Sequence, residues 1–408
     1  MGRRRLLFLA HRIPYPPDKG DKIRAWHMLD HLADRWDVDL GCLVDDPADL
    51  AHLGVLRGRC AVVEHALLPN RGRIARALMG MRPGRPLSLG WFRDARLAAW
   101  ARAGLGAGRY DAVLAYSSAM APYALGPAPG PVRRVLDMVD VDSEKWRAYA
   151  AGARPPMRQV WAREARTLLA FERRAAAAFD RTLLVSREEA ARFANLAPEV
   201  AGRIGWVDNG VDLGRFDPTL PFPASGEATL VFTGRMDYRP NVEAVIWFAG
   251  AVMPLLRARW PAAAFSIVGA KPSPDVLALA QLPGVTVTGE VPDTRPFIAA
   301  ATACVAPLRI ARGIQNKVLE AMAMARPVIC SPQAFEGVHA VAGRDLLVAD
   351  DAGSWVEAIG AVFAGRHPGL GPRARQAIEA GHDWTVTLRA LDAALENAPA
   401  PRQQEVAA

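Results

Sequence analysis

Short apolar runs alternate with longer amphipathic stretches along this chain of 408 residues. The runs Leu6–Ala10, Ala112–Tyr116 and Ala303–Leu308 are almost continuously hydrophobic, which is typical of strands buried on both faces of a parallel sheet. Between them lie stretches with apolar residues at helical spacing, the clearest of which covers about 156–179. The pattern therefore predicts an α/β fold built on parallel sheets.

The alternation occurs in two halves, and a stretch rich in proline and glycine separates them. Residues 212–227 hold three prolines and two glycines with little periodicity, which favours an interdomain linker. Because the chain is too long for a single core, we predict a first domain over 1–211 and a second over 228–378. We interpret 379–397 as a C-terminal helix able to cross back to the first domain, and 398–408 as a disordered tail.

One strand–loop–helix–strand unit in the second half carries the best-defined candidate chemistry. The apolar run ending at Leu308 leads into a loop with a glycine and then into a helix that contains Lys317 and Glu320. Parallel sheets place ligands at the carboxyl ends of their strands, and the free N–H groups of a first helical turn attract anions. We therefore expect Lys317 at a diphosphate site. Glu320, one turn further on, could reach a sugar hydroxyl there, or it could be an ordinary solvated glutamate.

Further charged residues stand where strands are expected to end. Arg235 and Arg239 flank a strand-to-helix turn, a suitable place to neutralise a diphosphate, although arginine is common throughout the chain. Asp140 and Asp142 follow the predicted strand 132–138 and could bind a metal or position hydroxyls. Asp142 could equally be the N-cap of the next helix.

The loop after the first strand runs to Gly20, where backbone can come close to a ligand. This loop is not a GxGxxG fingerprint, which disfavours a nicotinamide cofactor.

The net charge of +8 is concentrated in the first half. Residues 1–211 hold 33 Lys and Arg against 23 Asp and Glu, a surplus of ten, whereas the remainder holds 17 against 19. Nine arginines and one acid lie between 70 and 110, beside apolar residues at helical spacing, which indicates contact with an anionic membrane surface. A solvated helix face and a general Arg- and Ala-rich composition are the alternatives. Because interleaved aromatic residues are lacking, we expect no nucleic-acid partner.

Cysteine usage and the apolar segments point to the cytoplasm. The four cysteines show no metal-type spacing, which is typical of reduced thiols. The apolar run at Leu6–Ala10 is too short for a signal peptide, and Ala244–Leu256 is too short to span a membrane.

Five motifs in order resemble those of the large glycosyltransferase family 4, and the resemblance covers nearly the whole chain. They are the loop to Gly20, Asn209-Gly210-Val211-Asp212, Gly234-Arg235, Gly289-Glu290-Val291-Pro292-Asp293, and Glu320-Ala321-Met322-Ala323 with Pro327-Val328. The segments 137–146, 236–241 and 313–320 are similar to sugar transferases that accompany PEP-CTERM/exosortase exopolysaccharide systems. The resemblance implies the GT-B architecture, two Rossmann-like doubly wound parallel-sheet domains facing across a cleft, with the acceptor on the first.

The resemblance also implies roles for individual residues. Gly20, followed by Asp21, would bring backbone amides to the distal phosphate, while Arg235, Arg239 and Lys317 would hold the diphosphate. Glu290 and Val291 would lie by the base, Glu320 on the ribose, and Asp140 or Asp142 on the sugar. The other positions implied to contact substrate are Gly234 and, in the loop, Arg312, Gly313, Ile314, Gln315 and Asn316. Two departures stand out: Arg312 occupies the place of the family's first glutamate, and Asp21 that of a second glycine.

The activity implied is a hexosyl transfer with retention, from a nucleotide-diphosphate sugar to a lipid-linked or polysaccharide acceptor in exopolysaccharide biosynthesis. No cofactor and no metal would be needed, because the cationic residues would hold the diphosphate. The enzyme would be cytoplasmic, peripheral on the inner face of the membrane. A nucleotide-sugar epimerase of the same fold and a catalytically inert nucleotide-binding protein are the alternatives.

Overall fold

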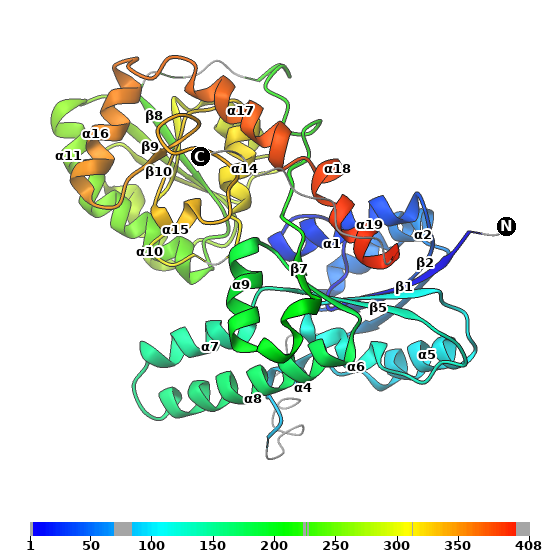
Figure 1. Cartoon of the computed structure of the whole chain (residues 1–408). Coiled ribbons are helices and arrows are strands. Elements are labelled where there is room, and N and C mark those ends of the chain that lie inside the picture. Colours follow the sequence, from blue (N-terminus) through cyan, green and yellow to red (C-terminus); the bar gives the residue numbers. More distant parts are fainter. Residues whose placement is uncertain (1–2, 69–83, 223–225, 227, 312, 397–408) are drawn as a thin grey trace. The chain divides into compact units, whose positions relative to one another are not determined.

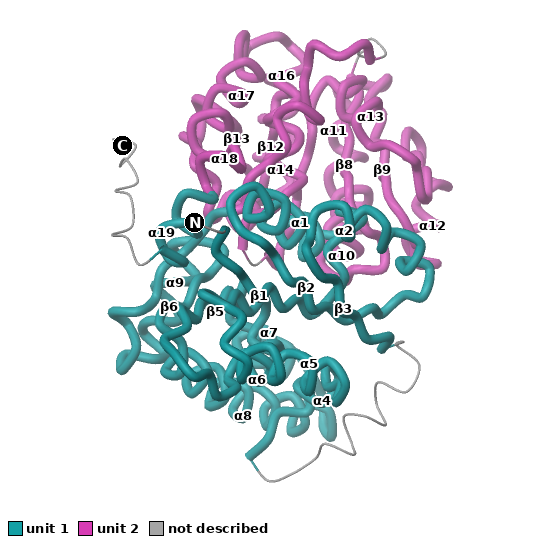
Figure 2. The backbone as a smooth tube through the Cα atoms, turned by 90° about the vertical axis from the view of Figure 1, so that its right-hand side faces the viewer, with its two compact units in different colours: residues 1–208, 388–402 teal, residues 209–387, 403–408 magenta. Residues whose placement is uncertain are grey.

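The computed structural model describes residues 3–68, 84–222, 226, 228–311 and 313–396. The chain forms two compact units, each with its own parallel sheet and its own hydrophobic core (Figure 2). Unit 1 contains Met1–Asp208 and the C-terminal segment from Leu388, and unit 2 contains Asn209–Thr387.

Unit 1 is built on a seven-stranded sheet in the order β3-β2-β1-β4-β5-β6-β7, in which every neighbouring pair is parallel (Figure 1). The central strands β1 and β4 are buried almost throughout, as the continuous apolar runs predict. The strand order reverses between β1 and β4, which is where such sheets place ligands. The strands are β1 (Arg5–Ala10), β2 (Asp37–Val44), β3 (Val62–Leu67), β4 (Ala112–Tyr116), β5 (Arg133–Val139), β6 (Arg181–Leu184) and β7 (Ile204–Trp206).

Helices cover the sheet of unit 1, and one of them comes from the end of the chain. Ser186 caps α9 by accepting a hydrogen bond from the Glu189 amide at 3.2 Å. The final helix α19 is attached to unit 1 because Arg133 Nε donates to the Ala394 carbonyl at 2.9 Å. The helices are α1 (Gly20–Ala33), α2 (Leu53–Arg59), α4 (Ser88–Trp91), α5 (Ala95–Gly106), α6 (Ala121–Ala124), α7 (Asp142–Ala151), α8 (Met157–Ala178), α9 (Arg187–Leu196) and α19 (Arg389–Glu396), with 3₁₀ turns η1 (Pro47–His52), η2 (Ser118–Met120) and η3 (Pro198–Arg203).

Unit 2 contains a six-stranded parallel sheet in the order β10-β9-β8-β11-β12-β13. Its strand order reverses between β8 and β11. The strands are β8 (Thr229–Thr233), β9 (Ala264–Val268), β10 (Val285–Gly289), β11 (Ala303–Ala306), β12 (Val328–Cys330) and β13 (Leu347–Val348). The helices are α10 (Arg239–Trp247), α11 (Met253–Arg259), α12 (Pro274–Ala278), α13 (Arg295–Ala300), α14 (Asn316–Ala323), α15 (Pro332–Phe335), α16 (Ala352–Phe363), α17 (Leu370–Gly381) and α18 (Trp384–Thr387), with the π-helix η4 (Phe248–Val252) and the 3₁₀ turn η5 (Leu279–Gln281).

The segment expected to be a linker lies in unit 2. Phe216 is only 8% exposed in the core of that unit, and Leu213 and Phe222 pack against the same core. The expectation from proline and glycine content misses these apolar contacts, and unit 2 already begins at Asn209. The expected tail 398–408 lies outside the described residues.

The dipeptide Asn209-Gly210 is typical of a tight turn, but the structure forms no turn there. Gly210 does not adopt a positive φ, and a Cβ there would lie 2.7 Å from the Trp384 ring. The glycine is required because an aromatic side chain packs on its backbone.

One helix among the described residues, Arg239–Arg259, is long and apolar enough to cross a membrane by length and composition. It comprises α10, η4 and α11, and its residues Val245, Phe248 and Val252 are buried in the core of unit 2. Its apolar face therefore serves the core. The four cysteines are free and buried.

Candidate functional site

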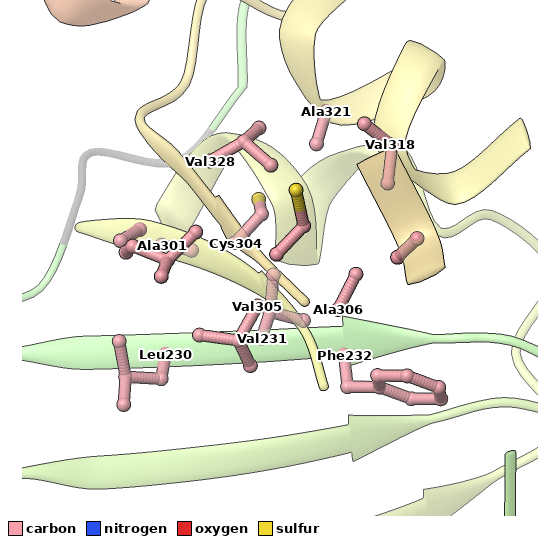
Figure 3. Close-up of a cluster of buried hydrophobic side chains, with 14 of the residues drawn as sticks. Leu230, Val231, Phe232, Ala301, Cys304, Val305, Ala306, Val318, Ala321 and Val328 are labelled. Atoms are coloured by element: carbon pink, nitrogen blue, oxygen red, sulfur yellow. The ribbon is translucent and has the colours of Figure 1, made fainter. Parts of the chain in front are cut away.

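The candidate site of unit 2 lies at the carboxyl ends of β8 and β11, where the strand order reverses. Gly234 follows β8, and α14 follows the loop after β11 and carries Lys317 and Glu320. The inner residues of α14, Val318 and Ala321, pack on the sheet among the buried side chains of β8 and β11 (Figure 3). This packing holds the first turn of α14 beside the end of β8.

Two glycines allow the backbone to approach closely at this point. A Cβ on Gly269, which follows β9, would lie 1.7 Å from the Gly234 carbonyl oxygen, so only glycine fits there. Gly234 has a φ of 152°, and a Cβ on it would lie 2.8 Å from Asn241 Nδ2 and 3.1 Å from Lys317 Nζ. The glycine thus leaves room for the amide and the ammonium that converge on it.

Lys317 has few charges around it. Its Nζ donates to Asn241 Oδ1 at 2.6 Å and lies 4.2 Å from the centre of the Phe232 ring. Asn241 in turn donates from Nδ2 to the Arg235 carbonyl at 2.9 Å, which fixes the amide. Burial lowers the pKa of Lys317 to about 7, although the Glu320 carboxylate opposes this shift. A bound anion would therefore stabilise the charged form of this side chain.

Glu320 lies one helical turn beyond Lys317 and is partly buried. Burial raises its pKa to about 7, while the charges of Arg215 and Lys317 oppose the shift. The structure thus places Lys317 and Glu320 one turn apart on α14, with the charge of Arg215 from the expected linker acting on Glu320.

The loop before α14 presents backbone groups. Gly313 has a φ of 62°, and its carbonyl accepts a hydrogen bond from Gln315 Nε2 at 3.1 Å. Gln315 is the N-cap residue, but its side chain makes no capping hydrogen bond to the first-turn amides. Asn316 Oδ1 accepts from Asn209 Nδ2 at 3.2 Å, and Ile314 is buried. Arg312 lies outside the described residues.

The two arginines expected to hold a diphosphate pair with neighbouring acids. Arg235 Nη2 lies 2.8 Å from Asp237 Oδ2, and Arg239 Nε lies 2.6 Å from Glu243 Oε1. Arg235 joins the Lys317 group through its carbonyl oxygen, whereas the Arg239 side chain is 62% exposed. Asn241 is the residue that sequence reasoning missed; its position two residues after Arg239, at the start of a helix, was the available signal.

Glu290 and Val291 follow β10 at the same edge of the sheet. Glu290 is exposed, Val291 is packed against the core, and Gly289 before them has a φ of 72°. No recorded contact among the described residues joins either to Lys317. Their role beside a base stays a prediction.

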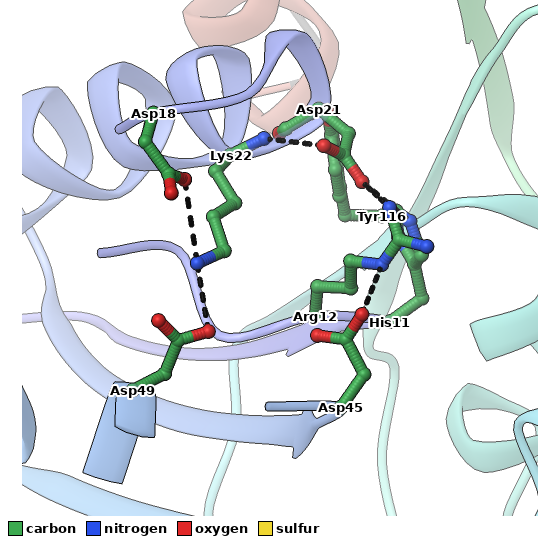
Figure 4. Close-up of polar contacts among 8 residues, drawn as sticks. All are labelled: His11, Arg12, Asp18, Asp21, Lys22, Asp45, Asp49 and Tyr116. Carbon is green, nitrogen blue, oxygen red and sulfur yellow. Dashed lines mark hydrogen bonds and ion pairs between the residues drawn. The ribbon is translucent and has the colours of Figure 1, made fainter. Parts of the chain in front are cut away.

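In unit 1 the corresponding reversal point, between β1 and β4, is filled by the chain's own charges (Figure 4). Arg12 bridges Asp21 at 2.5 Å and Asp45 at 3.2 Å, and His11 lies 3.4 Å from Asp21 and stacks on Tyr116. Burial alone would raise the pKa of Asp21, but the hydrogen bond to His11 and the charge of Arg12 hold it well below its usual range.

Gly20 is the exposed first residue of α1, as a phosphate-contacting glycine would require. The next residue interferes with that role. Asp21 Oδ1 accepts from the Lys22 amide at 3.1 Å, so one first-turn amide of α1 is occupied by the chain's own carboxylate. Lys22 is itself buried and paired with Asp49 at 2.8 Å.

Asp140 and Asp142 lie together after β5, also in unit 1. Burial, with the nearby carboxylates of Asp142 and Glu189, raises the pKa of Asp140 to about 7. Burial also raises the pKa of Asp142, while the charges of Lys145 and His11 oppose that shift. Asp140 Oδ1 is buried and has no hydrogen-bond partner among the described residues.

Asp142 is not the N-cap of α7. Val141 occupies that position, and Asp142 is the first helical residue. The Val141 and Ser143 amides instead donate to Glu189 at 3.1 Å and to Glu172 at 3.2 Å. Carboxylates from neighbouring helices thus satisfy the start of α7, which leaves Asp142 free of that task.

The charged groups suit an organic diphosphate better than a metal. Among the described residues no group of three or more His, Cys, Asp or Glu could hold a metal ion. The unit 2 site offers instead a lysine, an amide and helix amides, which are donors for phosphate oxygens.

Part of the chain matches a known protein family, and nearly the whole chain resembles solved structures. Residues 227–364 match the family described as Glycosyl transferases group 1. The chain is similar to sucrose-phosphate synthase from Thermosynechococcus elongatus, with 19% identity, a TM-score of 0.66 and 97% of each chain covered. It is similar to Anabaena HepE in complex with UDP-glucose, with 14% identity, a TM-score of 0.68 and 96% and 99% of the two chains covered. A glycosyltransferase from Rickettsia africae gives 12% identity, a TM-score of 0.65 and coverage of 96% and 98%.

No curated protein sequence matches the chain. At these identities the solved structures establish the fold, which is that of the two-domain GT-B glycosyltransferases, as predicted. The match to the family described as Glycosyl transferases group 1 falls within unit 2.

Proposed function

We propose that this chain is a retaining glycosyltransferase that moves a hexosyl group from a nucleotide-diphosphate sugar to a hydroxyl of a lipid-linked or polysaccharide acceptor. The observation that carries the proposal is the convergence of Gly234, Asn241 and Lys317 at the reversal point of unit 2, with Glu320 one turn away. A diphosphate would lie against Lys317 and the first turn of α14, and its ribose would lie by Glu320.

The transfer breaks the bond from the anomeric carbon to a phosphate oxygen and forms a bond to the acceptor oxygen. Negative charge grows on the leaving diphosphate, so cations and helix amides aimed at it lower the barrier. The acceptor proton passes to the leaving phosphate oxygen on the same face, which gives retention without a separate base. A half-buried lysine with a pKa near 7 is suited to this task because the growing charge favours its protonated form.

A uridine nucleotide is the first donor to test. HepE, a structural neighbour, was solved in complex with UDP-glucose. In this chain, Glu290 and Val291 stand at the carboxyl end of β10, where a base would lie if the diphosphate is at α14. We expect binding without a metal ion, because Lys317, Arg235 and Arg239 supply the positive charge.

The remaining assignments follow from the resemblance of the motifs. We propose family 4 membership, a role in exopolysaccharide biosynthesis beside a PEP-CTERM/exosortase system, and a location on the inner face of the cytoplasmic membrane. Asp140 or Asp142 would contact the transferred sugar, and Gly20 a phosphate.

The test combines a thermal-shift screen of nucleoside diphosphates and their sugars with a product assay. A glycosyltransferase is stabilised by its donor and releases nucleotide in proportion to glycosylated acceptor. Epimerised free sugar with no acceptor product would establish the epimerase alternative. Stabilisation by nucleotides without turnover of any donor would establish an inert binding protein.

A further inference from the structure

The described part of the basic segment 70–110 does not offer a free apolar face. In α5, the apolar residues Leu97, Ala101 and Leu105 are buried in the core of unit 1. Arg96 on the opposite face pairs with Glu64 at 2.6 Å. A membrane contact in unit 1 therefore needs another element, and residues 69–83 lie outside the described residues.

The turn between α7 and α8 presents the exposed combination that α5 lacks. The two helices pack side by side, and their turn lies at the end of the pair that points away from the unit 1 sheet (Figure 1). Residues 154–160 are all exposed. Two of them are apolar: Met157 is 43% exposed and Val160 is 39% exposed. We refer to residues 154–160 as the hairpin tip.

The charge of the tip has one sign. From Lys145 to Arg163 the chain carries five cations and no acid. Within the described residues, no ion pair involves Arg154 or Arg158, which flank Met157. Two exposed arginines thus border the apolar residues with their charge uncompensated, which complements an anionic surface.

Aromatic side chains continue from the tip along the hairpin. Trp161 follows it in α8, and its ring lies 5.8 Å from that of Tyr149, which lies 5.9 Å from that of Trp146. All three are partly exposed. Tryptophan and tyrosine are favoured where an apolar layer meets water, because each joins an apolar ring to a polar atom.

We propose that the hairpin tip docks on the surface of a bilayer containing anionic lipid. Arg154 and Arg158 would lie among the headgroups, and Met157 and Val160 would enter the acyl boundary, as on other interfacial helices. A soluble polyanion would use the arginines but would leave the apolar pair in water. The inference concerns where the chain sits, so it does not require the proposed sugar transfer.

The first test is co-sedimentation with vesicles of phosphatidylcholine, with and without phosphatidylglycerol. Each basic residue near an anionic surface contributes about fivefold to binding. We expect the full chain to bind the anionic vesicles, and the double variant Arg154→Gln/Arg158→Gln to bind about 25-fold more weakly. The variant Met157→Ser/Val160→Ser should lose the binding that persists at high salt, because salt screens charge but not apolar burial.

The matched control is Arg166→Gln/Arg174→Gln. These arginines are exposed on the same helix beyond the tip, and the change removes the same charge. It should weaken binding less than twofold. Equal losses in the two double variants, or no vesicle binding by the full chain, would overturn the proposal, as would unchanged binding after the tip substitutions.

A second test detects insertion. Because the four native cysteines are buried, an environment-sensitive fluorophore can be attached selectively at Met157→Cys, with Arg174→Cys as the control. Anionic vesicles should shift the emission to the blue at position 157 and leave it unchanged at 174. A shift at neither site would contradict docking by the tip.

If the hairpin tip binds a polyanion or a second copy of the chain instead of a membrane, the binding measurements will give different results. Heparin binding that depends on Arg154 and Arg158, without vesicle binding, would identify a polyanion site and refute the membrane assignment. Loss of self-association in Met157→Ser/Val160→Ser would identify a contact between copies and would also refute it. Donor-dependent thermal stabilisation in the same variants shows separately whether the nucleotide site remains intact.

Discussion

The two sheets of this protein reverse their strand order in the same way, yet their reversal points differ in charge. In unit 1, Arg12 and Lys22 each bridge two carboxylates, so the positive charges are neutralised within the chain. In unit 2, Lys317 donates to a neutral amide and lies over an aromatic ring. The same topology therefore yields one reversal point whose cations form ion pairs with carboxylates and another whose lysine is hydrogen-bonded to a neutral amide.

The physical reason is local. Asp21 follows Gly20 and places a carboxylate at the start of α1, where its own chain binds it. No acid occupies the first turn of α14. Gly234 leaves room in front of that turn for the Asn241 amide and the Lys317 ammonium, and Gly269 lets its loop backbone pack directly on that of Gly234. The comparison indicates that the residues of the first helical turn, and not the fold, decide whether the reversal point of the strand order can bind a ligand.

The largest expected effect is structural and falls in unit 1. Arg24 is 1% exposed, and its Nη2 lies 2.7 Å from Asp137 Oδ2. Arg24→Met leaves the buried Asp137 carboxylate uncompensated, so unit 1 should lose about 3–5 kcal/mol of unfolding free energy. Urea unfolding followed by circular dichroism measures this loss. The control Arg173→Met breaks an exposed pair and should cost less than about 1 kcal/mol.

The second effect is catalytic and falls in unit 2. Lys317→Met removes the cation from the proposed diphosphate site, so kcat/KM should fall about 100- to 1,000-fold, equivalent to about 2.7–4 kcal/mol. The melting temperature should not fall, since a desolvated charge is removed. Steady-state kinetics with the best donor measures the loss. Arg259→Met, which removes a cation stacked on Trp260, should leave kcat/KM within about twofold. Equal activity of wild type and Lys317→Met would exclude the assignment.

The third effect tests the ion pairs around Asp21 at the reversal point of unit 1. Asp21→Asn removes the anion between Arg12 and His11, and should destabilise the protein at pH 7 by about 1.5–3 kcal/mol. The pKa of Asp21 is lowered in the folded state, so its contribution is present above the unfolded pKa of 3.8 and is lost as the pH falls further. The difference between variant and wild type should therefore shrink towards pH 3 in thermal denaturation. A difference that is independent of pH would show that packing, not charge, is responsible.

The smallest effects are shifts of a few degrees in melting temperature with pH. The pKa of Lys317 falls from 10.5 to about 7 on folding, so the unfolded state binds more protons between these values and stability rises with pH there. Lys317→Met should therefore stabilise the empty protein more at pH 6 than at pH 10.

Glu320, in the same site, should give a pH dependence of stability with the opposite sign. Its pKa rises from 4.5 to about 7, so the folded state binds more protons and stability falls as the pH rises through that window. Glu320→Gln should stabilise more at pH 8 than at pH 4. Parallel pH profiles for the two variants would contradict the burial of both charges.

Sequence patterns predicted much of the unit 2 site. Lys317 and Glu320 were expected together because a continuous apolar run before Arg312 predicts a buried strand, and the helical spacing of apolar residues after it predicts a helix that carries both. Asn241 and Arg215 were not expected: the first is an ordinary helix-start residue, and the second lies in a segment rich in proline. Both reach the site through contacts between residues far apart in the chain, which local periodicity does not encode.

Local composition is misleading both in the expected linker and at Asn209-Gly210, because contacts with residues distant in the sequence decide both structures. Residues 212–222 have the composition of a loop, but Phe216 finds a place in the core of unit 2. The pair Asn209-Gly210 is typical of a turn, but glycine is required at 210 because the Trp384 ring, distant in the sequence, packs against its backbone.

By itself the sequence determined the parallel α/β architecture in two halves and the position of a cationic helix start after a buried strand, because continuous apolar runs and helical spacing are local properties. Only the tertiary structure decided which charges remain available. Whether Lys317 or Lys22 has a carboxylate beside it depends on residues distant in the sequence, and burial then sets the pKa of each group.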